Sequence, residues 1–451
     1  MAARELHLNL NAMSNGVYPG SWLLPDSVDD GFYNLEHWLN LARIAERGKF
    51  DAYFLADAPV FAAETGLRPP FHQGLDPLML LVAIAGATSH IGLIATTTTT
   101  YGAPYDTARR VASLDFLSGG RAAWNAVTTA TGRGAAENFG DQPHPERATR
   151  YDRAAEFIAV VRQLWDSWDD DAILADHEER QYLRPGSVHS IDHAGEYFSV
   201  KGPLQLPRSP QGNPIVFQAG GSDQGRELAA READGIFSLA LDRESAKDYA
   251  NDVRRRARAY GRDPDEITIL PGLVSIIGST EAEARAKQAE LNELAGGGPS
   301  IQRLAAILEI DADALSLDKP VPLELIPQRP DQVRGSFAFH NATADIARKG
   351  LTVREILQQG GGGHRLLVGS PEQVAESIID WFGYGAADGF NLMPAAVPSG
   401  VEIFVDHVVP ILQQRGVFRT EYAGTTLRDH FGLERRASRA RVEPVASVVS
   451  V

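Results

Sequence analysis

Short apolar segments alternate with longer amphipathic segments along most of the chain. Residues 6–11 alternate apolar and polar side chains with a period of two, as a strand does. Asn34 then precedes a stretch with apolar residues every three or four positions, which predicts a helix capped by the Asn side chain. This order of strand and helix recurs, with further strand-like segments at 52–56, 91–95, 122–127, 214–218, 235–240, 269–278 and 389–393. Eight strands separated by helices favour a parallel α/β fold.

Two architectures fit this pattern, a closed (β/α)8 TIM barrel and an open doubly wound sheet. The even spread of the strands over 451 residues favours the barrel, enlarged by insertions at about 171–211 and 296–363. The first insertion is expected to carry a hairpin at 197–200, and the second is the longest irregular region. Glycine clusters bound the second insertion, so a lid over the barrel and a static excursion both fit it. We expect one domain over 1–433 and a flexible tail at 434–451.

Polar residues gather at the carboxyl ends of four predicted strands. They are Asp57, the threonine run 96–100, Asn125 with Thr128, and the run 220–222. In a barrel these ends meet at one mouth, where active sites form. Exposure to solvent explains any single polar strand end, but four together indicate a site.

The run Gly220-Gly221-Ser222 is the best candidate for binding a phosphate. Glycines let the backbone approach an anion closely, and a Ser at a helix N-terminus adds a hydroxyl beside the N–H groups. An ordinary Ser N-cap explains the same residues equally well, and the spacing matches neither a Walker nor a Rossmann motif. Arg147 and Tyr151 lie four residues apart, so a helix that begins early enough would present both to the same phosphate.

Composition excludes several classes of protein. The 59 acidic residues outnumber the 43 Lys and Arg residues, which gives a net charge of −16 and argues against a nucleic-acid partner. Neither a membrane span nor a signal peptide is evident, so a cytoplasmic protein is expected. The chain has no Cys, which excludes disulfides, thiolate metal sites and a Cys nucleophile.

Other candidate groups are weaker. His189, Asp192 and His193 have the spacing of metal ligands, but no third convergent ligand is identifiable, so no metal is expected. No complete nucleophile signature occurs, so no catalytic residue is assigned and a cofactor is the economical explanation. Four side chains are candidates to line a pocket, although each such residue is more often structural: His72, Tyr101, His340 and His364.

Several short runs carry a resemblance to a known family. The most specific are WNAVTT at 124–129 and QAGGS at 218–222; FLAD at 54–57, RYD at 150–152 and DGFN at 388–391 also match. Together the matching runs span about 5–415 in order. The chain resembles the bacterial-luciferase-like flavin monooxygenases, in the branch of nitrilotriacetate, EDTA and dibenzothiophene-sulfone monooxygenases.

The resemblance implies a (β/α)8 barrel that binds FMN at its C-terminal mouth. Position by position, Asp57 and a residue of the threonine strand would face the isoalloxazine. Thr97 is the first choice in that strand and Thr98 the second. Asn125 and Thr128 would line the flavin pocket.

The resemblance also implies an anchor for the flavin phosphate. Arg147, Tyr151 and the pair Gly221-Ser222 would hold it. The family often has a His at the position of Arg147, so this chain keeps a group able to bind an anion but changes the detailed contact.

The family reaction takes reduced FMN from a separate NAD(P)H:FMN reductase and uses O2 to oxygenate a small organic molecule. The substrate is expected to be a sulfur compound, an aminopolycarboxylate or a similar molecule. A transient complex with the reductase and a homo-oligomer are expected. Two other classes stay open, a deazaflavin-dependent oxidoreductase on the same barrel and a non-catalytic flavin-binding protein.

Overall fold

A computed structural model describes residues 4–18, 20–61, 74–129, 133–140, 143–295, 301–328, 333, 337–358 and 363–438. Its centre is a barrel of eight parallel strands, each paired with the next along the chain, and the last pairs with the first. The strands are β1 (His7–Asn11), β2 (Ala52–Leu55), β3 (Gly92–Thr98), β4 (Ala122–Val127), β9 (Ile215–Gln218), β10 (Gly235–Ser238), β11 (Thr268–Ile277) and β13 (Gly389–Pro394). The predicted (β/α)8 barrel and its eight strands are confirmed.

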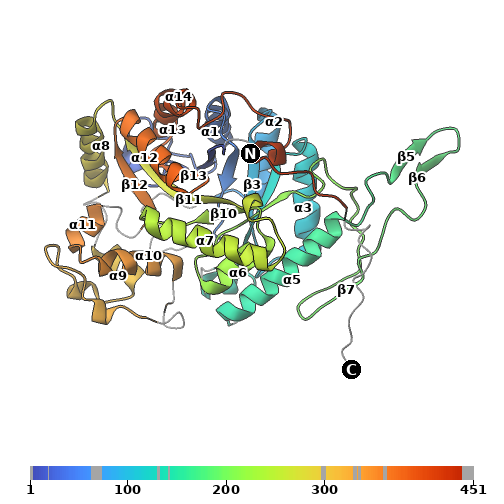
Figure 1. Cartoon of the computed structure of the whole chain (residues 1–451), viewed down its shortest axis with the longest axis horizontal. Coiled ribbons are helices and arrows are strands. Elements are labelled where there is room, and N and C mark those ends of the chain that lie inside the picture. Colours follow the sequence, from blue (N-terminus) through green and yellow to red (C-terminus); the bar gives the residue numbers. More distant parts are fainter. Residues whose placement is uncertain are drawn as a thin grey trace.

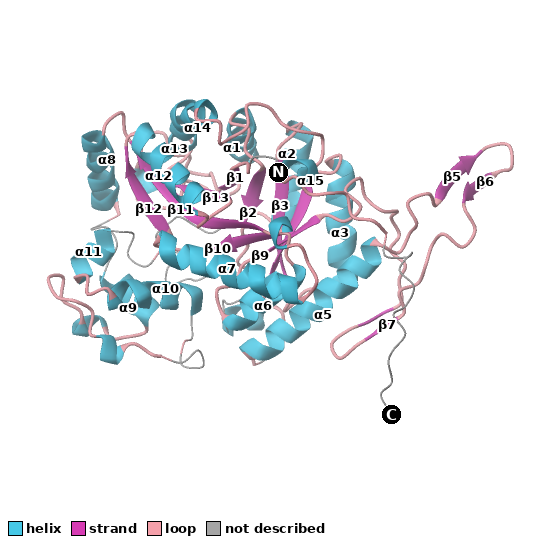
Figure 2. Cartoon of the chain, viewed as in Figure 1, coloured by secondary structure: helices cyan, strands magenta, loops and turns pink. Residues whose placement is uncertain are grey.

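Helices surround the barrel (Figures 1 and 2). They are α1 (Leu35–Arg47), α2 (Pro77–Ala87), α3 (Pro104–Leu117), α4 (Arg133–Asn138), α5 (Arg147–Trp165), α6 (Asp223–Glu232), α7 (Arg243–Ala259), α8 (Glu281–Leu294), α12 (Pro371–Tyr384), α13 (Ser399–Ile403) and α14 (Val409–Gln414). The expected cap is present, because the Asn34 side chain accepts a hydrogen bond from the His37 N–H at 3.3 Å. Within the described residues, no helix combines the length and apolar character needed to cross a membrane.

A ninth strand, β12 (Arg365–Gly369), was not predicted. It pairs with the second half of β11, which is ten residues long and extends beyond the barrel ring. The short β12 follows a glycine cluster and lacks the alternation of β1, so its pattern gave no strand signal.

The prediction that 296–363 is irregular was wrong. The described part of this insertion contains α9 (Ile301–Leu308), α10 (Phe337–Arg348) and α11 (Val353–Gln358). These helices pack on a small apolar core of their own, which includes Leu304, Leu308 and Val353. The bounding clusters 296–298 and 360–362 lie outside the described residues.

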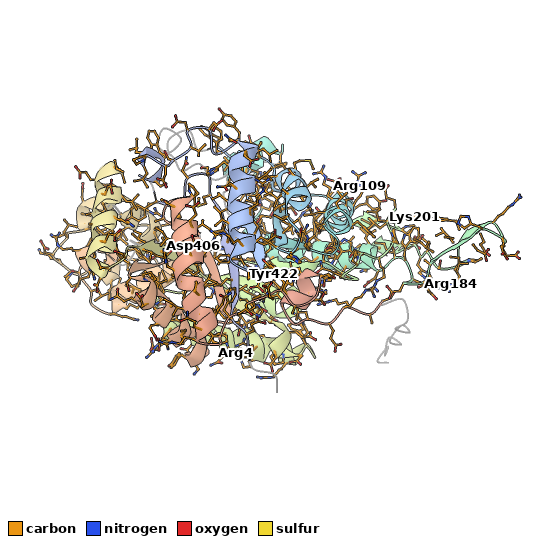
Figure 3. The ribbon with its side chains drawn as sticks, turned by 90° about the horizontal axis from the view of Figure 1, so that it is seen from above. Arg4, Arg109, Arg184, Lys201, Asp406 and Tyr422 are labelled. Atoms are coloured by element: carbon orange, nitrogen blue, oxygen red, sulfur yellow. The ribbon has the colours of Figure 1, made fainter. Side chains whose placement is uncertain are left out.

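The first insertion carries two hairpins rather than one. The predicted segment 197–200 forms the turn and second strand of the pair β7 (His193–Ala194) and β8 (Ser199–Val200). A second pair, β5 (Ile173–Asp176) and β6 (Gln181–Leu183), was not predicted. It forms an arm that projects away from the barrel (Figure 1), and Arg184 lies at its base, beyond the surrounding helices (Figure 3).

A short helix, α15 (Leu427–His430), closes the amino-terminal end of the barrel. Leu427 is fully buried in the cluster that fills the barrel, together with Ile94 and Phe217. The start of the expected tail is also attached here, because Arg436 forms an ion pair with the buried Asp234 at 2.7 Å. Residues 439–451 of that tail lie outside the described residues.

Candidate functional site

Asn125 forms one wall of the barrel mouth. It pairs in register with Thr96 of β3, and its amide Nδ2 donates to the Thr96 hydroxyl at 2.9 Å. Asn125 is 3% exposed, yet its Oδ1 has no hydrogen-bond partner among the described residues. An unsatisfied buried oxygen costs about 1–3 kcal/mol. This oxygen therefore fits a site that receives an N–H donor from a ligand.

The two threonine candidates lie on opposite faces of β3. The Thr97 hydroxyl accepts a hydrogen bond from the indole Nε1 of Trp124 at 2.7 Å, on the face away from Asn125. Thr98 shares the face of Asn125, and its hydroxyl accepts a hydrogen bond from that of Thr129 at 2.6 Å. Strand alternation therefore brings Thr98, and not Thr97, towards the mouth.

Asp57 and Thr128 stand at neighbouring edges of the same mouth. Asp57 follows β2 and is half-buried, and burial raises the pKa of its carboxyl, with a further contribution from the charge of Asp76. Thr128 follows β4 and is also half-buried. The strand-end residues expected from the sequence thus come together at one end of the barrel.

The side chains of Tyr151 and Ser222 lie in contact. Helix α5 begins at Arg147, so Tyr151 lies one turn into it. The Tyr151 hydroxyl lies 3.4 Å from the Ser222 hydroxyl, which also caps α6 by accepting from the Gly225 N–H at 3.1 Å. Arg147 reaches from the same turn towards the second insertion, where it donates to the Val333 carbonyl at 3.4 Å.

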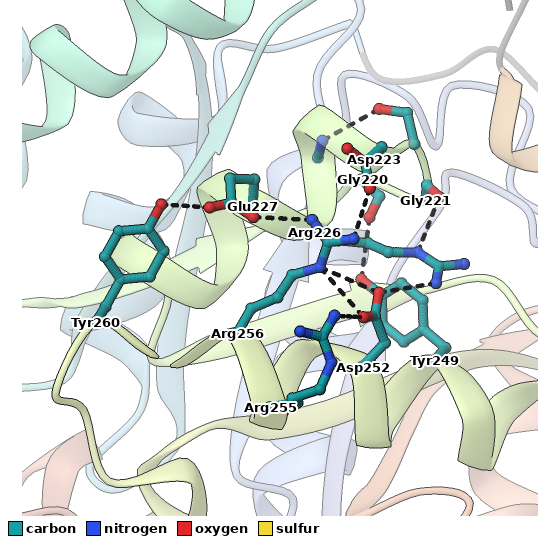
Figure 4. A network of polar contacts seen from close by, with 12 residues as sticks. Gly220, Gly221, Asp223, Arg226, Glu227, Tyr249, Asp252, Arg255, Arg256 and Tyr260 are labelled. Atoms are coloured by element: carbon teal, nitrogen blue, oxygen red, sulfur yellow. Dashed lines mark hydrogen bonds and ion pairs between the residues drawn. The ribbon is translucent and has the colours of Figure 1, made fainter. Parts of the chain in front are cut away.

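The carbonyls of Gly220 and Gly221 are both held from the side of α6 and α7 (Figure 4). The Tyr249 hydroxyl donates to the Gly220 carbonyl at 3.0 Å, and Arg226 Nε donates to the Gly221 carbonyl at 3.3 Å. A trans peptide sets each N–H opposite to the preceding carbonyl. The N–H groups of Gly221 and Ser222 therefore point away from these two donors, as an anion cradle at a helix N-terminus requires.

A network of charges holds Arg226, the donor to the Gly221 carbonyl, in place (Figure 4). Asp252 of α7 forms ion pairs with Arg226 at 3.1 Å and with Arg256 at 3.2 Å. Arg256 in turn reaches Asp223 at 2.5 Å and Glu227 at 2.8 Å, both on α6. The network links α6 to α7 and so stabilises the glycine run on the side of its carbonyl groups.

A chain of three polar side chains near the cradle was missed by the sequence reasoning. The Tyr101 hydroxyl lies 2.5 Å from Nδ1 of His144, and Arg150 donates to Nε2 of the same ring. Because a guanidinium can only donate, Nε2 must accept and the ring proton sits on Nδ1, facing Tyr101. Burial lowers the pKa of His144, and the charge of Arg150 lowers it further. Tyr101 was a pocket candidate, but no spacing rule connects it with a His 43 residues away.

His364 belongs to a group of aromatic side chains on the side of the barrel opposite β2 and β3. Its ring stacks on Phe237 of β10 at 5.1 Å and meets the edge of Phe339 at 5.2 Å. A side chain on Gly272 of β11 would come within 2.2 Å of the His364 ring, so this close approach requires glycine. Burial lowers the pKa of His364 to about 4, with a smaller effect from the charge of Arg303, so the imidazole is neutral at neutral pH.

The remaining histidine candidates have separate positions. His189 and His193 bind different carboxylates, Asp169 at 3.1 Å and Glu156 at 3.0 Å. Among the described residues, no three His, Asp or Glu side chains are grouped as a metal site needs. Both ring nitrogens of His340 face backbone carbonyls inside the second insertion, and His72 lies outside the described residues.

The fold defines a (β/α)8 barrel, and the polar strand ends and the glycine run 220–222 lie at its C-terminal mouth. The sequence model of the luciferase-like monooxygenases matches residues 19–388, and the chain belongs to this family. It is 43% identical to the N-acetyl-S-(2-succino)cysteine monooxygenase of Bacillus subtilis, over 97% of this chain and 98% of that protein. It is 40% identical to nitrilotriacetate monooxygenase component A of Aminobacter aminovorans, over 96% and 98% of the two chains.

A solved structure agrees with this assignment. Riboflavin lyase with modified FMN and riboflavin superposes with a TM-score of 0.82 at 32% identity, over 96% of each chain. The resemblance inferred from the short runs is confirmed, and the enzyme is a monooxygenase. Because relatives over nearly the whole chain are named monooxygenases, neither a deazaflavin-dependent oxidoreductase nor a non-catalytic protein is favoured.

Proposed function

We propose that this chain is the oxygenating component of a two-component system, which receives reduced FMN from a separate NAD(P)H:FMN reductase. The observation that carries the proposal is the cradle at 220–222, whose carbonyls are turned away from the N–H groups and whose Ser222 meets Tyr151. Such a cradle suits the phosphate of FMN. The relative named component A supports a partner protein. We also propose a cytoplasmic setting, where a reductase of this kind would find NAD(P)H.

The protein's residues would bind and orient the flavin. Ser222 and the backbone at Gly221 would hold the phosphate, with the Tyr151 hydroxyl beside them. The Asn125 Oδ1 would accept a hydrogen bond from an N–H of the isoalloxazine, because its Nδ2 is already committed to Thr96. When bound, reduced FMN supplies the electrons that activate O2.

We assign Asp57 and Thr98 to the ring side of the flavin pocket, with Thr128 beside them. Thr98 is preferred to Thr97, which is committed to Trp124 on the other face of the strand. The apolar interior below the mouth, including Phe54 and Phe217, limits the access of water to the reacting centre.

The substrate would lie against the opposite wall, formed by Phe237 and His364. We propose a small thioether or amine that carries carboxylate groups, since the wall is aromatic and Arg303 of α9 adds a positive charge that acts on both His364 and Tyr18. The named substrates of the two relatives, N-acetyl-S-(2-succino)cysteine and nitrilotriacetate, are carboxylated molecules of this kind.

Oxygen uptake tests the function. Purified protein mixed with photoreduced FMN should change the rate of flavin reoxidation and, with a suitable thioether, incorporate one oxygen atom from ¹⁸O2 into the product. Protein that neither binds reduced FMN nor alters its reoxidation would refute the proposal. The same assay, run on carboxylated thioethers and their methyl esters with a supplied reductase, tests the substrate class. Arg303→Gln should raise the KM of the acids and leave that of the esters unchanged.

We also propose that the enzyme assembles as a homo-oligomer.

A further inference from the structure

Two of the four methionines of the chain lie at the C-terminal mouth of the barrel. Met393 is the last residue but one of β13, and Met13 follows the end of β1 by two residues. They are 8% and 4% exposed, and both belong to one apolar cluster. Of the other two, Met79 lies on α2, outside the barrel, and Met1 is outside the described residues. The mouth therefore holds two thioethers of its own.

Strand alternation turns the Met393 side chain into the barrel. Phe390 and Leu392 of β13 belong to the core between the barrel and its helices, so Asn391 and Met393 face the other way. The Asn391 Oδ1 accepts a hydrogen bond from Asn9 of β1 at 3.0 Å, and both of these side chains are fully buried. Met393 lies one strand position of the same face closer to the mouth, directly above this pair.

The segments that follow β1 and β13 are packed together, which places Met13 beside Met393. The Val17 N–H donates to the Pro394 carbonyl at 3.0 Å. A side chain on Gly16 would come within 2.4 Å of the Ala395 carbonyl oxygen, so this close approach requires glycine. The two methionines thus stand at the ends of neighbouring strands.

Met393 also adjoins the place that we assign to the substrate. It is in register with Val274 of β11, and Phe237 packs against the cluster that contains both. Phe237 in turn stacks on His364 at 5.1 Å. A substrate lying against Phe237 and His364 would bring the atom that is oxygenated close to the Met393 sulfur.

The methionine sulfur has the chemistry of a substrate. It is a polarizable thioether with a lone pair, and thioethers are one of the two classes of substrate proposed above. Oxidation to the sulfoxide adds one oxygen atom of O2 to that lone pair, and no bond of the side chain breaks. The other oxygen atom leaves as water, while reduced FMN supplies the two electrons and two protons and becomes FMN. This step therefore rests on the proposed function.

We propose that Met393 is an oxidation site of the enzyme's own reaction, used when no substrate lies against Phe237 and His364. Met393 reacts before Met13, because it is the less buried of the two. The sulfoxide places a polar oxygen in an apolar cluster and so weakens the binding of the next substrate molecule. Turnover without substrate then ends in a modified enzyme, which methionine sulfoxide reduction restores.

Mass spectrometry with ¹⁸O2 tests the proposal. The variant Leu325→Met adds an exposed thioether as a reference, since Leu325 is 49% exposed on the second insertion. This protein is mixed with photoreduced FMN, ¹⁸O2 and catalase, without substrate, and its peptides are mapped. Label should enter Met393 at least ~tenfold faster than position 325. With added H2O2 and no flavin the order should reverse, because peroxide in solution reaches the exposed sulfur first.

Two further variants separate the site from the rest of the chain. Met393→Leu keeps the apolar volume and should abolish the gain of one oxygen in the intact mass, while the matched control Met79→Leu should leave that gain unchanged. FMN titration reports whether each variant is folded.

The outcomes also separate this proposal from the proposed function. Label confined to Met13, equal labelling of Met393 and position 325, or label that catalase abolishes would each overturn the oxidation site. A protein that does not alter the reoxidation of FMN refutes the proposed function as well. A protein that alters it and leaves Met393 unlabelled refutes the oxidation site alone.

Discussion

Replacement of Tyr249 by Phe tests whether the cradle is pre-formed by its supports. Tyr249 is 8% exposed, its hydroxyl donates to the Gly220 carbonyl at 3.0 Å, and its ring lies 5.0 Å from the Arg226 guanidinium. The change removes one buried hydrogen bond, which is worth about 0.5–1.5 kcal/mol. If that bond orients the 220–221 peptide, the same free energy is lost from phosphate binding. At about 1.4 kcal/mol per factor of ten, FMN should bind roughly two- to twelvefold more weakly.

Fluorescence titration with FMN and with riboflavin measures this effect. Riboflavin lacks the phosphate, so its affinity should not change. Tyr260→Phe is the matched control, since it removes a hydroxyl from the same network that bonds to Glu227 and not to the glycine carbonyl. The reasoning is refuted if Tyr249→Phe weakens both ligands equally, weakens neither, or has the same effect as the control.

Three other variants test separate parts of the structure. The double variant Tyr151→Phe, Ser222→Ala should lower the affinity for FMN relative to riboflavin by about tenfold or more; an unchanged ratio, measured by titration, would reject the phosphate anchor. His430 is 2% exposed, and burial chiefly lowers its pKa from 6.5 to about 4. Its neutral form is favoured in the folded state, so its contribution is complete above pH 6.5 and is lost as the pH falls towards 4. Urea unfolding should show that the wild type loses about 2 kcal/mol more than His430→Phe between pH 7.5 and pH 5. Leu427→Ala should reduce the free energy of unfolding by about 2–5 kcal/mol and leave FMN affinity unchanged, because Leu427 lies at the opposite end of the barrel; a large loss of affinity would contradict that separation.

Periodicity was enough to predict the barrel, because its strands are short apolar or alternating runs that are separated by helices. Tyr151 and Ser222 were both expected from the resemblance, and the fold brings their hydroxyls within 3.4 Å of each other. The choice between Thr97 and Thr98 did not, because five consecutive threonines give no sign of which side chains face the interior. Only the register with Asn125 and the bond from Trp124 to Thr97 resolve it.

Two features could not be predicted from the sequence, for different reasons: the helices of the second insertion, and the contacts of His144 with Tyr101 and Arg150. Helix α9 has eight residues and α11 has six, so each is too short to give a decisive periodic signal, and their stability comes from packing on one another. His144 gains its meaning from Tyr101 and Arg150, which the fold brings to its two ring nitrogens. Contacts between distant segments of this kind require the tertiary structure.

Helix α15, which closes the amino-terminal end of the barrel, constrains the order of folding. Leu427 packs against strands that were synthesised hundreds of residues earlier, and the Leu427 N–H donates to the Gly120 carbonyl at 2.9 Å. Since every strand of the ring precedes α15, a nascent chain can pair its early strands but keeps an open, wettable interior until this segment has left the ribosome. Chaperone engagement should therefore persist until late in translation. In a circular permutant that places α15 ahead of β1, the closing helix would be synthesised first. Chaperones should then stay bound to the nascent chain for a shorter time.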